Sequence, residues 1–467
     1  MTKTQHVHFI GIGGSGLSAI ARLLLESGYT VSGSDRTLSP LAQELAKAGA
    51  RVFNGHSAEN IQQPDVVVRS SAVPDDNVEV EAALAAGIPV LKRSEFLGKL
   101  MEGKLVIAVA GTHGKTTTTA MIAWLFHRLD EDPSYIIGGT AKNLGSKNAH
   151  AGKGHAFIIE ADEYDRMFLG LNPDVIVVTT LEHDHPDCYP TPQSYQEAFE
   201  AFVGRLKPGG LLLVSRDQED THRLASAAPS GAIALTYGMH PQADYSAKNV
   251  HPNTKGGFTY KAVHNGETLA RVVMQAPGEH NVRNSLAALA VASEVLALDP
   301  LDEAALILGE FSGTGRRFDI QGEVDGITII DDYAHHPTEI QATLAAARAR
   351  YNDRRIWAVW QPHTYSRTRS LMDTFSTSFA DADRVIVTEV YSAREKALDF
   401  DNFSAAQVVE RMSHPGVQFI PALPSVTEHL LQNLQPGDVL LVLSAGDADQ
   451  ISAQVLANLR ERTKKDA

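Results

Sequence analysis

Val106-Ile107-Ala108-Val109-Ala110-Gly111-Thr112-His113-Gly114-Lys115-Thr116 is the stretch that decides the fold of this chain. Its apolar half predicts a buried strand, and the glycine-rich turn after it predicts a helix that begins near Lys115. In such a turn the backbone N–H groups cradle phosphates, the lysine reaches the terminal phosphates and the threonine hydroxyl serves Mg²⁺. The stretch therefore predicts a strand, an ATP phosphate loop and a helix.

The phosphate loop departs from the usual pattern at one place, because Val109 stands where a glycine is common. The glycine-lysine-threonine core is kept, and the run of threonines after Lys115 has no obvious packing role. We therefore prefer ATP phosphate binding to a purely structural glycine turn. The predicted ATP contacts in this loop are Gly111, Thr112, His113, Gly114, Lys115, Thr116 and Thr117.

Strand-like runs alternate with stretches of helical length on both sides of this loop. The runs are residues 7–10, 30–32, 66–69, 106–109, 157–159, 175–179, 211–214, 327–330, 356–360, 385–388 and 439–443. The alternation predicts βαβ units and mostly parallel sheets. Residues 238–274 differ, because Gly-Gly and Asn-Gly pairs among alternating residues predict a small antiparallel insertion with hairpins.

The length of 467 residues suggests about three domains at roughly 150 residues each. Glycine-marked boundaries fall near residues 98–104 and 311–315, each just before a new series of strands. We therefore predict an α/β protein with domains at residues 1–100, 101–312 and 313–467.

The formal net charge is 41 − 56 = −15. Such a charge argues against a general nucleic-acid or anionic-membrane surface, so that any phosphate site must be local. The chain starts without a signal-peptide pattern, and no stretch reaches roughly 18 consecutive apolar residues. We expect a cytoplasmic protein that binds no nucleic acid and inserts into no membrane. The single cysteine, Cys188, excludes an internal disulfide framework.

A second glycine loop, Gly11-Ile12-Gly13-Gly14-Ser15-Gly16, follows the first strand-like run and opens a helix predicted at residues 17–26. Glycines let the backbone approach a diphosphate at the helix N-terminus, and Asp35 follows the next strand as the acid of such a site. The alternative is a tight turn with a solvated Asp35. Whether a dinucleotide or another diphosphate nucleotide binds stays open. Two successive nucleotide loops suggest one nucleotide as substrate and one as energy source, which argues against a simple dehydrogenase.

Acids and histidines follow two apolar strands in the middle of the chain, within residues 160–165 and 181–187. The carboxyl ends of parallel strands are where such sheets bind ligands, and carboxylate oxygens suit Mg²⁺. We therefore expect Glu160 and His185 near a magnesium ion. Zinc at His183 and His185 is the alternative, but an upstream phosphate loop favours magnesium.

Four later groups combine arginines, histidines, amides and acids, at residues 280–284, 315–319, 331–337 and 361–367. Arginine supplies the fixed charge that phosphoryl transfer needs where negative charge develops. The alternatives are helix-cap or packing roles for His280 and His363, and interdomain salt bridges for Arg316 and Arg317.

Together these residues resemble the Mur ligase family, from Gly11 to about Gly446. The resemblance rests on seven motifs in fixed order, at residues 111–118, 160–165, 180–187, 280–284, 313–318, 331–339 and 361–368. It implies an N-terminal Rossmann-like domain for a UDP-sugar, a central P-loop ATPase-like domain with a mostly parallel sheet and the small antiparallel insertion, and a C-terminal Rossmann-like domain that brings in an amino acid. These three domains agree with the predicted cuts.

The resemblance is strongest to the members that add L-alanine, and it implies an ATP-dependent ligase of peptidoglycan precursor synthesis. The carboxylate of UDP-N-acetylmuramate would attack the γ-phosphate of ATP, and L-alanine would attack the resulting acyl phosphate. ATP and Mg²⁺ are the implied cofactors, and we expect a monomer or a homodimer. The nearest alternative is a recycling ligase that attaches a tripeptide to the same UDP-sugar. A non-catalytic ligase-like subunit and a folylpolyglutamate-synthetase-like activity fit the residues less well.

The resemblance also implies roles for single residues. Catalysis would involve Lys115, Glu160, His185, Arg317 and Asp332, with Mg²⁺ on Thr116, Glu160 and His185. Asn281, Asn284 and Arg317 would join the phosphate loop in ATP binding. Gly11, Gly13, Gly14, Ser15, Gly16, Asp35 and Ser71 would face the UDP-sugar, and Tyr333, His335, His336 and Arg367 would form the amino-acid side.

Three positions depart from the family pattern. Thr180 stands where relatives usually have asparagine, and Thr364 where some have a second arginine. Glu200 lies roughly where sister ligases have a carbamylated lysine. Its carboxylate would serve a second metal ion without modification, which is a hypothesis.

Overall fold

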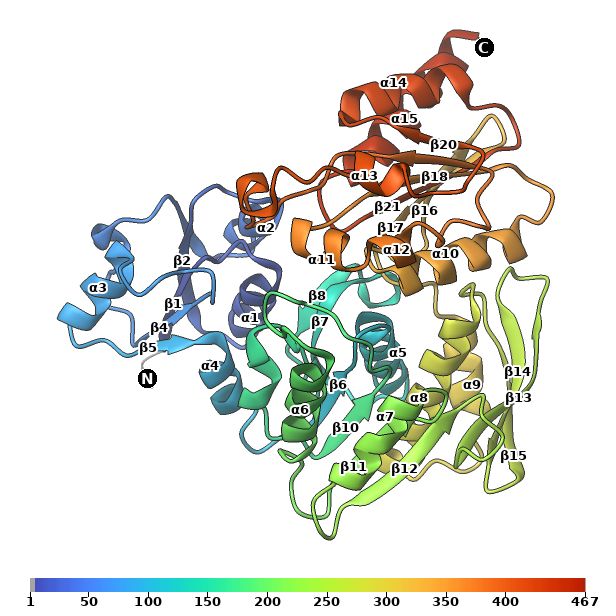
Figure 1. Cartoon of the computed structure of the whole chain (residues 1–467). Coiled ribbons are helices and arrows are strands. Elements are labelled where there is room, and N and C mark those ends of the chain that lie inside the picture. Colours follow the sequence, from blue (N-terminus) through green and yellow to red (C-terminus); the bar gives the residue numbers. More distant parts are fainter. Residues whose placement is uncertain (1–4, 467) are drawn as a thin grey trace.

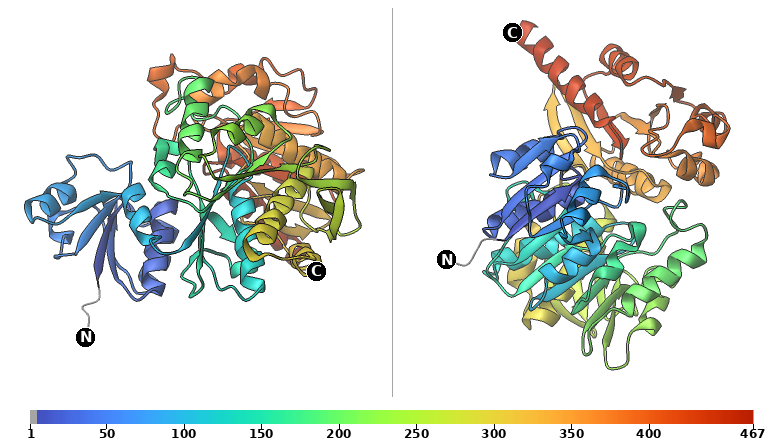
Figure 2. Two further views of the ribbon diagram at one scale, coloured as in Figure 1. Left: turned by 90° about the horizontal axis from the view of Figure 1, so that it is seen from below. Right: turned by 90° about the vertical axis from the view of Figure 1, so that its left-hand side faces the viewer.

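The structure, a computed structural model, describes residues 5–466 and has three α/β units in chain order (Figure 1). Figure 2 shows the N-terminal unit as a lobe beside the other two. Its sheet is fully parallel, in the order β3-β2-β1-β4-β5. The strands are β1 His6–Ile10, β2 Thr30–Asp35, β3 Arg51–Asn54, β4 Val66–Arg69 and β5 Val90–Lys92, and the helices are α1 Ser15–Glu26, α2 Pro40–Lys47, η1 Ala58–Asn60, α3 Val78–Ala85 and α4 Arg93–Leu100.

The central unit has a ten-stranded sheet in the order β15-β14-β13-β12-β11-β10-β6-β9-β7-β8. Its strands are β6 Leu105–Ala110, β7 Ser134–Ala141, β8 Lys147–His150, β9 Ala156–Glu160, β10 Val175–Val178, β11 Leu211–Ser215, β12 Ile233–Gly238, β13 Tyr245–Pro252, β14 Phe258–His264 and β15 Glu267–Val273. The helices are α5 Lys115–Arg128, η2 Lys142–Leu144, η3 Tyr164–Gly170, α6 Pro192–Val203, α7 Glu219–Arg223, η4 Leu224–Ala227, α8 Glu279–Leu296 and α9 Asp302–Gly309. The pairs β13–β14, β14–β15 and β7–β8 are antiparallel, and the other pairs are parallel.

The C-terminal unit has a six-stranded sheet in the order β16-β17-β21-β18-β19-β20, in which only the edge strand β16 runs antiparallel. Its strands are β16 Asp319–Val324, β17 Ile327–Asp332, β18 Ile356–Gln361, β19 Arg384–Val387, β20 Val417–Phe419 and β21 Val439–Ser444. The helices are α10 Pro337–Arg350, α11 Tyr365–Ser370, α12 Met372–Phe375, η5 Ala397–Phe400, α13 Ala406–Val409, α14 Leu423–Asn433 and α15 Asp449–Asp466.

The predicted α/β class is confirmed, and every apolar run that we assigned to a strand is a strand. The predicted antiparallel passage is confirmed: it extends the central sheet, so that this sheet is mixed. The predicted apolar runs leave out β3, β5, β7, β8, β12, β16 and β20. In β3, β5 and β16 the side chains are exposed or half-buried and carry little apolar signal.

No sheet among the described residues crosses either predicted domain cut. Strand β5 ends at Lys92 and β6 begins at Leu105, while α9 ends at Gly309 and β16 begins at Asp319. The division at residues 1–100, 101–312 and 313–467 stays a prediction, and residues 1–4 and 467 lie outside the described part of the chain.

Helix α5 corrects our view of the threonine run after the phosphate loop. Residues 116–126 of this helix are buried, and α5 packs against α8 as well as the sheet strands β7 and β9. Thr118 and Thr119 have no exposed surface, and the hydroxyl of Thr119 donates a hydrogen bond to the carbonyl of Lys115. Small side chains at these positions therefore do have a packing role, because they allow the helix to lie close to its neighbours.

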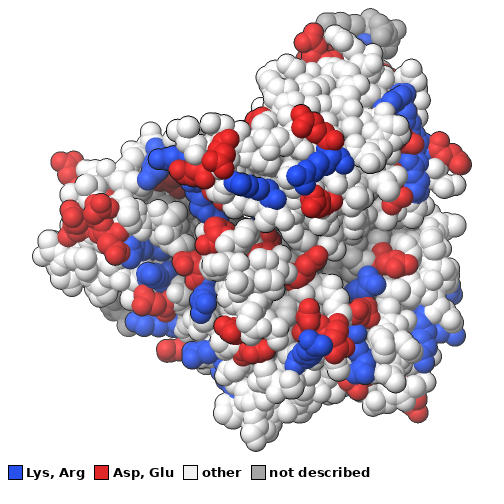
Figure 3. All heavy atoms as spheres, in the orientation of Figure 1, with Lys and Arg blue, Asp and Glu red and all other residues white. Residues whose placement is uncertain are grey.

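Charges of both signs are interspersed over the face of the molecule shown in Figure 3. Within residues 5–466, no helix combines the length and the apolar character that crossing a membrane requires.

A buried carboxylate joins the elements of the N-terminal unit. Glu79, at the start of α3, has no exposed surface and accepts hydrogen bonds from Ser34 at 2.5 Å, from Asn60 at 2.5 Å and from the backbone N–H of Ser57 at 3.1 Å. His8 of β1 lies 3.4 Å away. Burial raises the pKa of this carboxyl, but the hydrogen bonds overcome that effect and lower the pKa to about 2.

We expect Glu79→Gln to lower the free energy of unfolding by about 2 kcal/mol or more at neutral pH, because an amide offers one acceptor oxygen to several buried donors. Because the folded-state pKa lies below the ordinary 4.5, this contribution is present above pH 4.5 and is lost as the pH falls toward 2. Urea unfolding at neutral and acid pH measures it. Glu81→Gln on the exposed face of the same helix is the control; equal stability of the two variants would contradict the prediction.

Candidate active site

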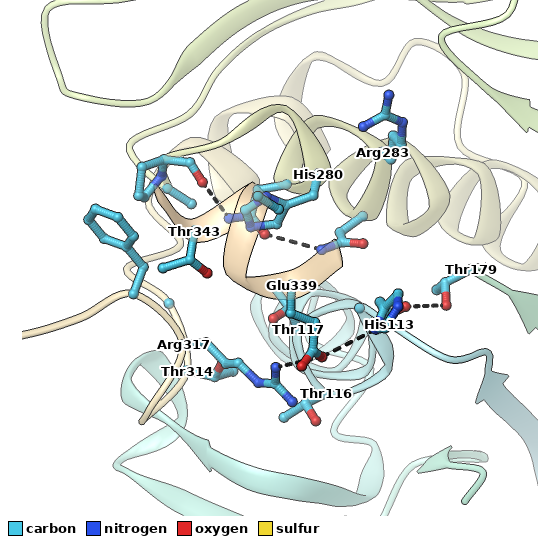
Figure 4. A pocket seen from close by; sticks show the side chains of 18 of the residues that line it. His113, Thr116, Thr117, Thr179, His280, Arg283, Thr314, Arg317, Glu339 and Thr343 are labelled. Carbon is cyan, nitrogen blue, oxygen red and sulfur yellow. Dashed lines mark hydrogen bonds and ion pairs between the residues drawn. The ribbon is translucent and has the colours of Figure 1, made fainter. Parts of the chain in front are cut away.

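A cavity of about 570 Å³ lies between the central and C-terminal units. Its walls come from the phosphate loop, the start of α8, the segment after α9 and the start of α10. Residues predicted for ATP or catalysis that line it are His113, Gly114, Thr116, Thr117, Asn281, Asn284, Arg317 and Asp332. The structure therefore brings segments that are far apart in the sequence to one site (Figure 4).

The phosphate loop depends on two glycines. Gly111 has φ +131° and Gly114 has φ +82°, which are backbone conformations that other residues rarely adopt. A Cβ atom on Gly111 would collide with Thr179, and one on Gly114 with Asn284. Helix α5 begins directly after Gly114, so its unpaired backbone N–H groups lie at the loop, where a phosphate suits them.

Lys115 is held inside the loop. Its Nζ donates hydrogen bonds to the carbonyls of Gly111 at 2.6 Å and Thr112 at 3.2 Å, and to Oε1 of Glu163 at 3.0 Å. Burial opposes its charge, but the attraction of Glu163 and Glu160 raises the pKa of Lys115. The ammonium group is thus charged and stands among acceptors that phosphate oxygens can replace.

Thr116 and Glu160 form an oxygen-rich pair beside the lysine. The Thr116 hydroxyl donates to Oε1 of Glu160 at 3.0 Å, and the backbone N–H of Gly138 donates to Oε2 at 2.6 Å. Burial is the main cause that raises the pKa of Glu160. A carboxylate whose charge is destabilised by burial, next to a hydroxyl, is a donor set that a hard cation suits.

His185 joins this cluster through Glu163, which our sequence analysis quoted only as part of an acidic run. Nε2 of His185 lies 3.5 Å from Oε1 of Glu163, and the side chain of Glu163 is almost fully buried. The backbone of His185 has φ +54°, an uncommon conformation for a residue with a side chain. The structure therefore places Thr116, Glu160 and His185 around Lys115 and Glu163.

His113 connects the phosphate loop to the C-terminal unit. Its Nε2 lies 2.8 Å from Oε2 of Glu182, and its Nδ1 lies 3.3 Å from Oε1 of Glu339 at the start of α10. Burial lowers the pKa of this imidazole, but the two carboxylates outweigh burial and raise it to about 9. His113 is therefore a cation at neutral pH, and it pairs with one acid from each side of the cavity.

Arg317, Asp332 and Glu339 stand on the opposite wall. Nη1 of Arg317 donates to Oε1 of Glu339 at 3.3 Å, a contact that Figure 4 shows beside the one to His113. Asp332, at the end of β17, accepts the backbone N–H groups of Phe318 at 2.6 Å and Ala334 at 2.8 Å. Burial is the main cause that raises the pKa of Asp332 to about 6.

The first turns of α8 supply the two predicted asparagines. Nδ2 of Asn284 donates to Oδ1 of Asn281 at 3.1 Å, and Nδ2 of Asn281 donates to the carbonyl of Pro277 at 2.7 Å. His280 also lines the cavity, and burial lowers its pKa to about 4, so that it is neutral there.

Three of the residues predicted for the amino acid, Tyr333, His335 and His336, follow β17, while Arg367 lies on α11. The Tyr333 and His335 rings meet edge to face at 5.3 Å between centroids, and Nδ1 of His335 bonds to the carbonyl of Tyr333. Burial lowers the pKa of His335 to about 3. His336 caps α10, since its Nδ1 accepts the backbone N–H of Thr338 at 3.3 Å.

Arg367 pairs with an acid of the central unit. Its Nε donates to Oδ1 of Asp184 at 2.8 Å, and both side chains are only 5% exposed. Its Nη1 bonds to Nδ1 of His363 at 3.1 Å and its Nη2 to Nδ1 of His185 at 3.4 Å. The guanidinium therefore joins the predicted amino-acid side to the predicted metal side across the domain boundary.

The first glycine loop is built as predicted, and Asp35 takes part in it. The backbone N–H of Gly13 donates to Oδ2 of Asp35 at 2.8 Å, and the φ of Gly11 is +86°. Asp35 thus braces the loop, which neither of our two expectations for this acid had included. Gly14 precedes α1, Ser15 begins the helix, the side chain of Ser15 is not described, and Ser71 is exposed.

Arg93, which our sequence analysis missed, links this loop to the central unit. A Cβ atom on Gly16 would collide with its guanidinium, so Gly16 leaves the room that the arginine fills. Nη2 of Arg93 lies 3.6 Å from Oδ2 of Asp162. The only available signal was the position of Arg93 directly after β5, at the start of a helix.

The structure describes the surroundings of the three positions that depart from the family pattern. The Thr180 hydroxyl accepts the backbone N–H of His113 at 2.9 Å, so that threonine supports the loop. Thr364 precedes α11 with φ +65°. Glu200 accepts a hydrogen bond from Gln196, while its α6 neighbour Tyr195 bonds to Thr112 and Glu163. The second-metal role of Glu200 stays a prediction.

Known proteins resemble this chain along its whole length. Relatives named UDP-N-acetylmuramate–L-alanine ligase from Desulfosudis oleivorans and Salinibacter ruber are each 41% identical to it, over 97% and 98% of this chain and 98% and 96% of theirs. The crystal structure of a UDP-N-acetylmuramate-alanine ligase from Thermotoga maritima matches with a TM-score of 0.82 and 28% identity, over 98% of this chain and 99% of that one. A murein peptide ligase from Psychrobacter arcticus matches with a TM-score of 0.74 and 26% identity, over 97% and 98% of the two chains.

Family models match the three units in turn. The Mur ligase family catalytic domain matches residues 6–105, the Mur ligase middle domain residues 109–292, and the Mur ligase glutamate ligase domain residues 316–446. The three matches together cover most of the chain and follow the order of its three sheets, and the chain belongs to the Mur ligase family.

Proposed function

We propose that this chain joins L-alanine to the carboxylate of UDP-N-acetylmuramate at the expense of ATP, as a step of peptidoglycan precursor synthesis. The observation that carries the proposal is the cavity in which the phosphate loop, the asparagines of α8 and the Arg317–Glu339 pair face one another. Relatives at 41% identity over nearly the whole of both chains carry the same activity in their names.

The reaction needs an activated carboxylate, because a carboxylate oxygen is a poor leaving group. In the proposed sequence a carboxylate oxygen of the UDP-sugar attacks the γ-phosphorus of ATP, and ADP leaves with the electrons of the broken P–O bond. The amino group of L-alanine then attacks the acyl carbon, inorganic phosphate leaves, and the nitrogen loses a proton. Family membership supports the use of ATP.

Lys115 is proposed to bind the β- and γ-phosphates. Its present acceptors are two loop carbonyls and Glu163, and phosphate oxygens would take their place around the same ammonium group. Arg317 on the facing wall would stabilise the negative charge that develops on the transferring phosphoryl group. Asn281 and Asn284 would position the nucleotide from α8, and Asp332 would hold the loop that carries Arg317, since it accepts the N–H of Phe318.

Mg²⁺ fits the residues that our sequence analysis named for it. Thr116 in the first turn of α5 and Glu160 at the end of β9 are oxygen ligands that bond to each other, and His185 lies 3.5 Å from Glu163 beside them. When bound, the ion would neutralise phosphate charge. The bound cation would also compensate the negative charge of Glu160, which burial otherwise destabilises.

The N-terminal unit is proposed to bind the UDP-sugar. The loop of Gly11, Gly13, Gly14, Ser15 and Gly16 lies at the N-terminus of α1, where a diphosphate suits the unpaired N–H groups. Asp35 would preserve the shape of that loop, and Ser71 would contact the ligand from the exposed segment after β4. Since UDP-sugars and ATP are cytoplasmic metabolites, we also propose a cytoplasmic location, and a monomer or homodimer stays our expectation.

The amino-acid side is proposed to consist of Tyr333, His335, His336 and Arg367. Nη2 of Arg367 has one N–H group beyond its contact with His185, which leaves a donor for the carboxylate of L-alanine. The pair with Asp184 would orient that donor toward the metal side of the cavity.

The first experiment identifies the amino component. We incubate the protein with UDP-N-acetylmuramate, ATP and Mg²⁺, add either L-alanine or the L-Ala-γ-D-Glu-meso-diaminopimelate tripeptide, and weigh the products. We expect ADP and a product one alanine residue heavier than the UDP-sugar. A product formed only with the tripeptide would assign the recycling activity instead.

Lys115→Met removes the charge that we place at the terminal phosphates. We expect kcat for ADP formation to fall by about 10²-fold or more, because the ammonium group stabilises the negative charge that develops in the transition state. Lys47→Met, on the exposed surface of α2, makes the same chemical change outside the site and serves as control. Similar activity of both variants would remove Lys115 from the mechanism.

Arg367→Met tests the two roles of this arginine. Leaving the buried Asp184 without its arginine should cost about 3 kcal/mol of stability, and the double variant Arg367→Met/Asp184→Asn should recover most of it. We expect KM for L-alanine to stay more than about tenfold raised in both variants, because the carboxylate loses its donor. If the double variant restores KM together with stability, Arg367 only joins the domains.

A further inference from the structure

Two histidines and a glutamate meet at the domain boundary, and their arrangement is not explained by the roles proposed for His113 in the phosphate loop and for His336 on the amino-acid side. They are His113 of the phosphate loop, Glu182 after β10 and His336 at the start of α10. One ligand atom from each lies within 4.8 Å of the other two. Nε2 of His113 is 2.8 Å and Nδ1 of His336 is 3.9 Å from Oε2 of Glu182. Donors around a tetrahedral ion are about 3.4 Å apart, so small shifts would complete a site.

The side chains behind these donors are also those of a metal site. Oε1 of Glu339 lies 3.3 Å from Nδ1 of His113, which directs the other ring nitrogen toward Glu182 and His336. The Thr338 hydroxyl donates to Oε1 of Glu182 at 2.8 Å and leaves Oε2 free to face the histidines. In metal sites a carboxylate often bonds to the second ring nitrogen of a histidine ligand, and a hydroxyl to the second oxygen of a carboxylate ligand. Such contacts orient the ligands toward the ion.

His336 adds an independent observation. Its side chain is 2% exposed, and its Nε2 atom is buried without a hydrogen-bond partner among the described residues. The His113 and His336 rings lie 4.8 Å apart between centroids, so both imidazoles reach the same place at the boundary. Nδ1 of this ring already accepts the N–H of Thr338, so Nε2 is the nitrogen for which the described residues supply no partner.

We propose that His113, Glu182 and His336 bind one transition-metal ion of the Zn²⁺ class, which ties the phosphate loop to α10 and holds the domains closed. Two imidazoles and one carboxylate suit zinc better than magnesium, for which oxygen ligands should predominate, as they do at the proposed Mg²⁺ site. Three protein ligands leave the fourth position to water. The ion would take the place of the proton that His113 otherwise carries, because a neutral imidazole is the form that binds a metal. His113, Thr338 and Glu339 line the nucleotide cavity, so the ion would oppose the opening that exchange of nucleotides requires. Zn²⁺ would therefore inhibit the enzyme at a site separate from the one proposed for Mg²⁺.

Binding is measured on the full chain without substrates, in excess Mg²⁺. We titrate Zn²⁺ against a chromophoric chelator and record the visible spectrum with Co²⁺, whose absorption reports four-coordinate geometry and imidazole ligands. We expect one ion per chain with a four-coordinate spectrum. A stoichiometry of zero, or a six-coordinate Co²⁺ spectrum, would overturn the proposal.

Two variants remove a ligand and keep its hydrogen bonds. His336→Asn retains an acceptor for the N–H of Thr338, because asparagine caps helices well, and Glu182→Gln retains an oxygen for the hydroxyl of Thr338. We expect each to weaken Zn²⁺ binding at least tenfold. His183→Gln is the matched control, since Nε2 of that neighbouring histidine bonds to the carbonyl of Tyr189 and faces no other metal donor in the cluster. It should bind Zn²⁺ like the parent.

Thermal unfolding measures how far the ion stabilises the closed form. Saturating Zn²⁺ should raise the melting temperature of the parent and of His183→Gln, but not of His336→Asn, because an ion that binds only the folded, closed form stabilises it by mass action. Loss of Zn²⁺ binding in His185→Gln, with full binding in His336→Asn, would place the ion at the magnesium site and overturn the inference. These outcomes do not depend on whether alanine or a tripeptide is the substrate.

Discussion

The carboxylate of Glu339 is the group on which the closed site depends. It lies 3.3 Å from His113 of the central unit and accepts a hydrogen bond from Arg317, while its second oxygen accepts the backbone N–H of His335 at 3.1 Å. Burial alone would raise its pKa, but the surrounding cations and donors hold it well below the usual range. A buried charge of this kind is tolerated only with its partners in place, so the carboxylate keeps the two walls of the cavity together.

A second buried pair across the same boundary acts in the same way. Arg367 and Asp184 are both almost fully buried and come from different units. Opening the domains would expose these charges to water, which solvates them well, whereas separating them without water would be costly. The pair therefore helps to specify the geometry in which the two units meet.

The cations of the site have protein partners that substrates can replace. Lys115 is bonded to loop carbonyls and Glu163, and Arg317 to Glu339. Phosphate oxygens offer the same kind of contact, so a nucleotide could take over these cations, while Glu163 would keep its contact with His185 and Glu339 its contact with His113. The acids around these cations are therefore as important to the site as the cations themselves, because they balance the buried positive charges.

The amino-acid sequence by itself determined the parts that depend on neighbouring residues. The phosphate loop, the strand before it and the helix after it follow from glycines with positive φ and from a continuous apolar run, and the order of motifs indicated the family. Only the tertiary structure decided how the acids are used. Glu163, Glu182 and Glu339 were within the quoted runs, yet their partners lie 48, 69 and 22 residues away from them in the chain, at Lys115, His113 and Arg317. Local patterns carry no information about such pairs, because folding alone brings these side chains together, and the same holds for Asp35, which braces a loop instead of facing solvent.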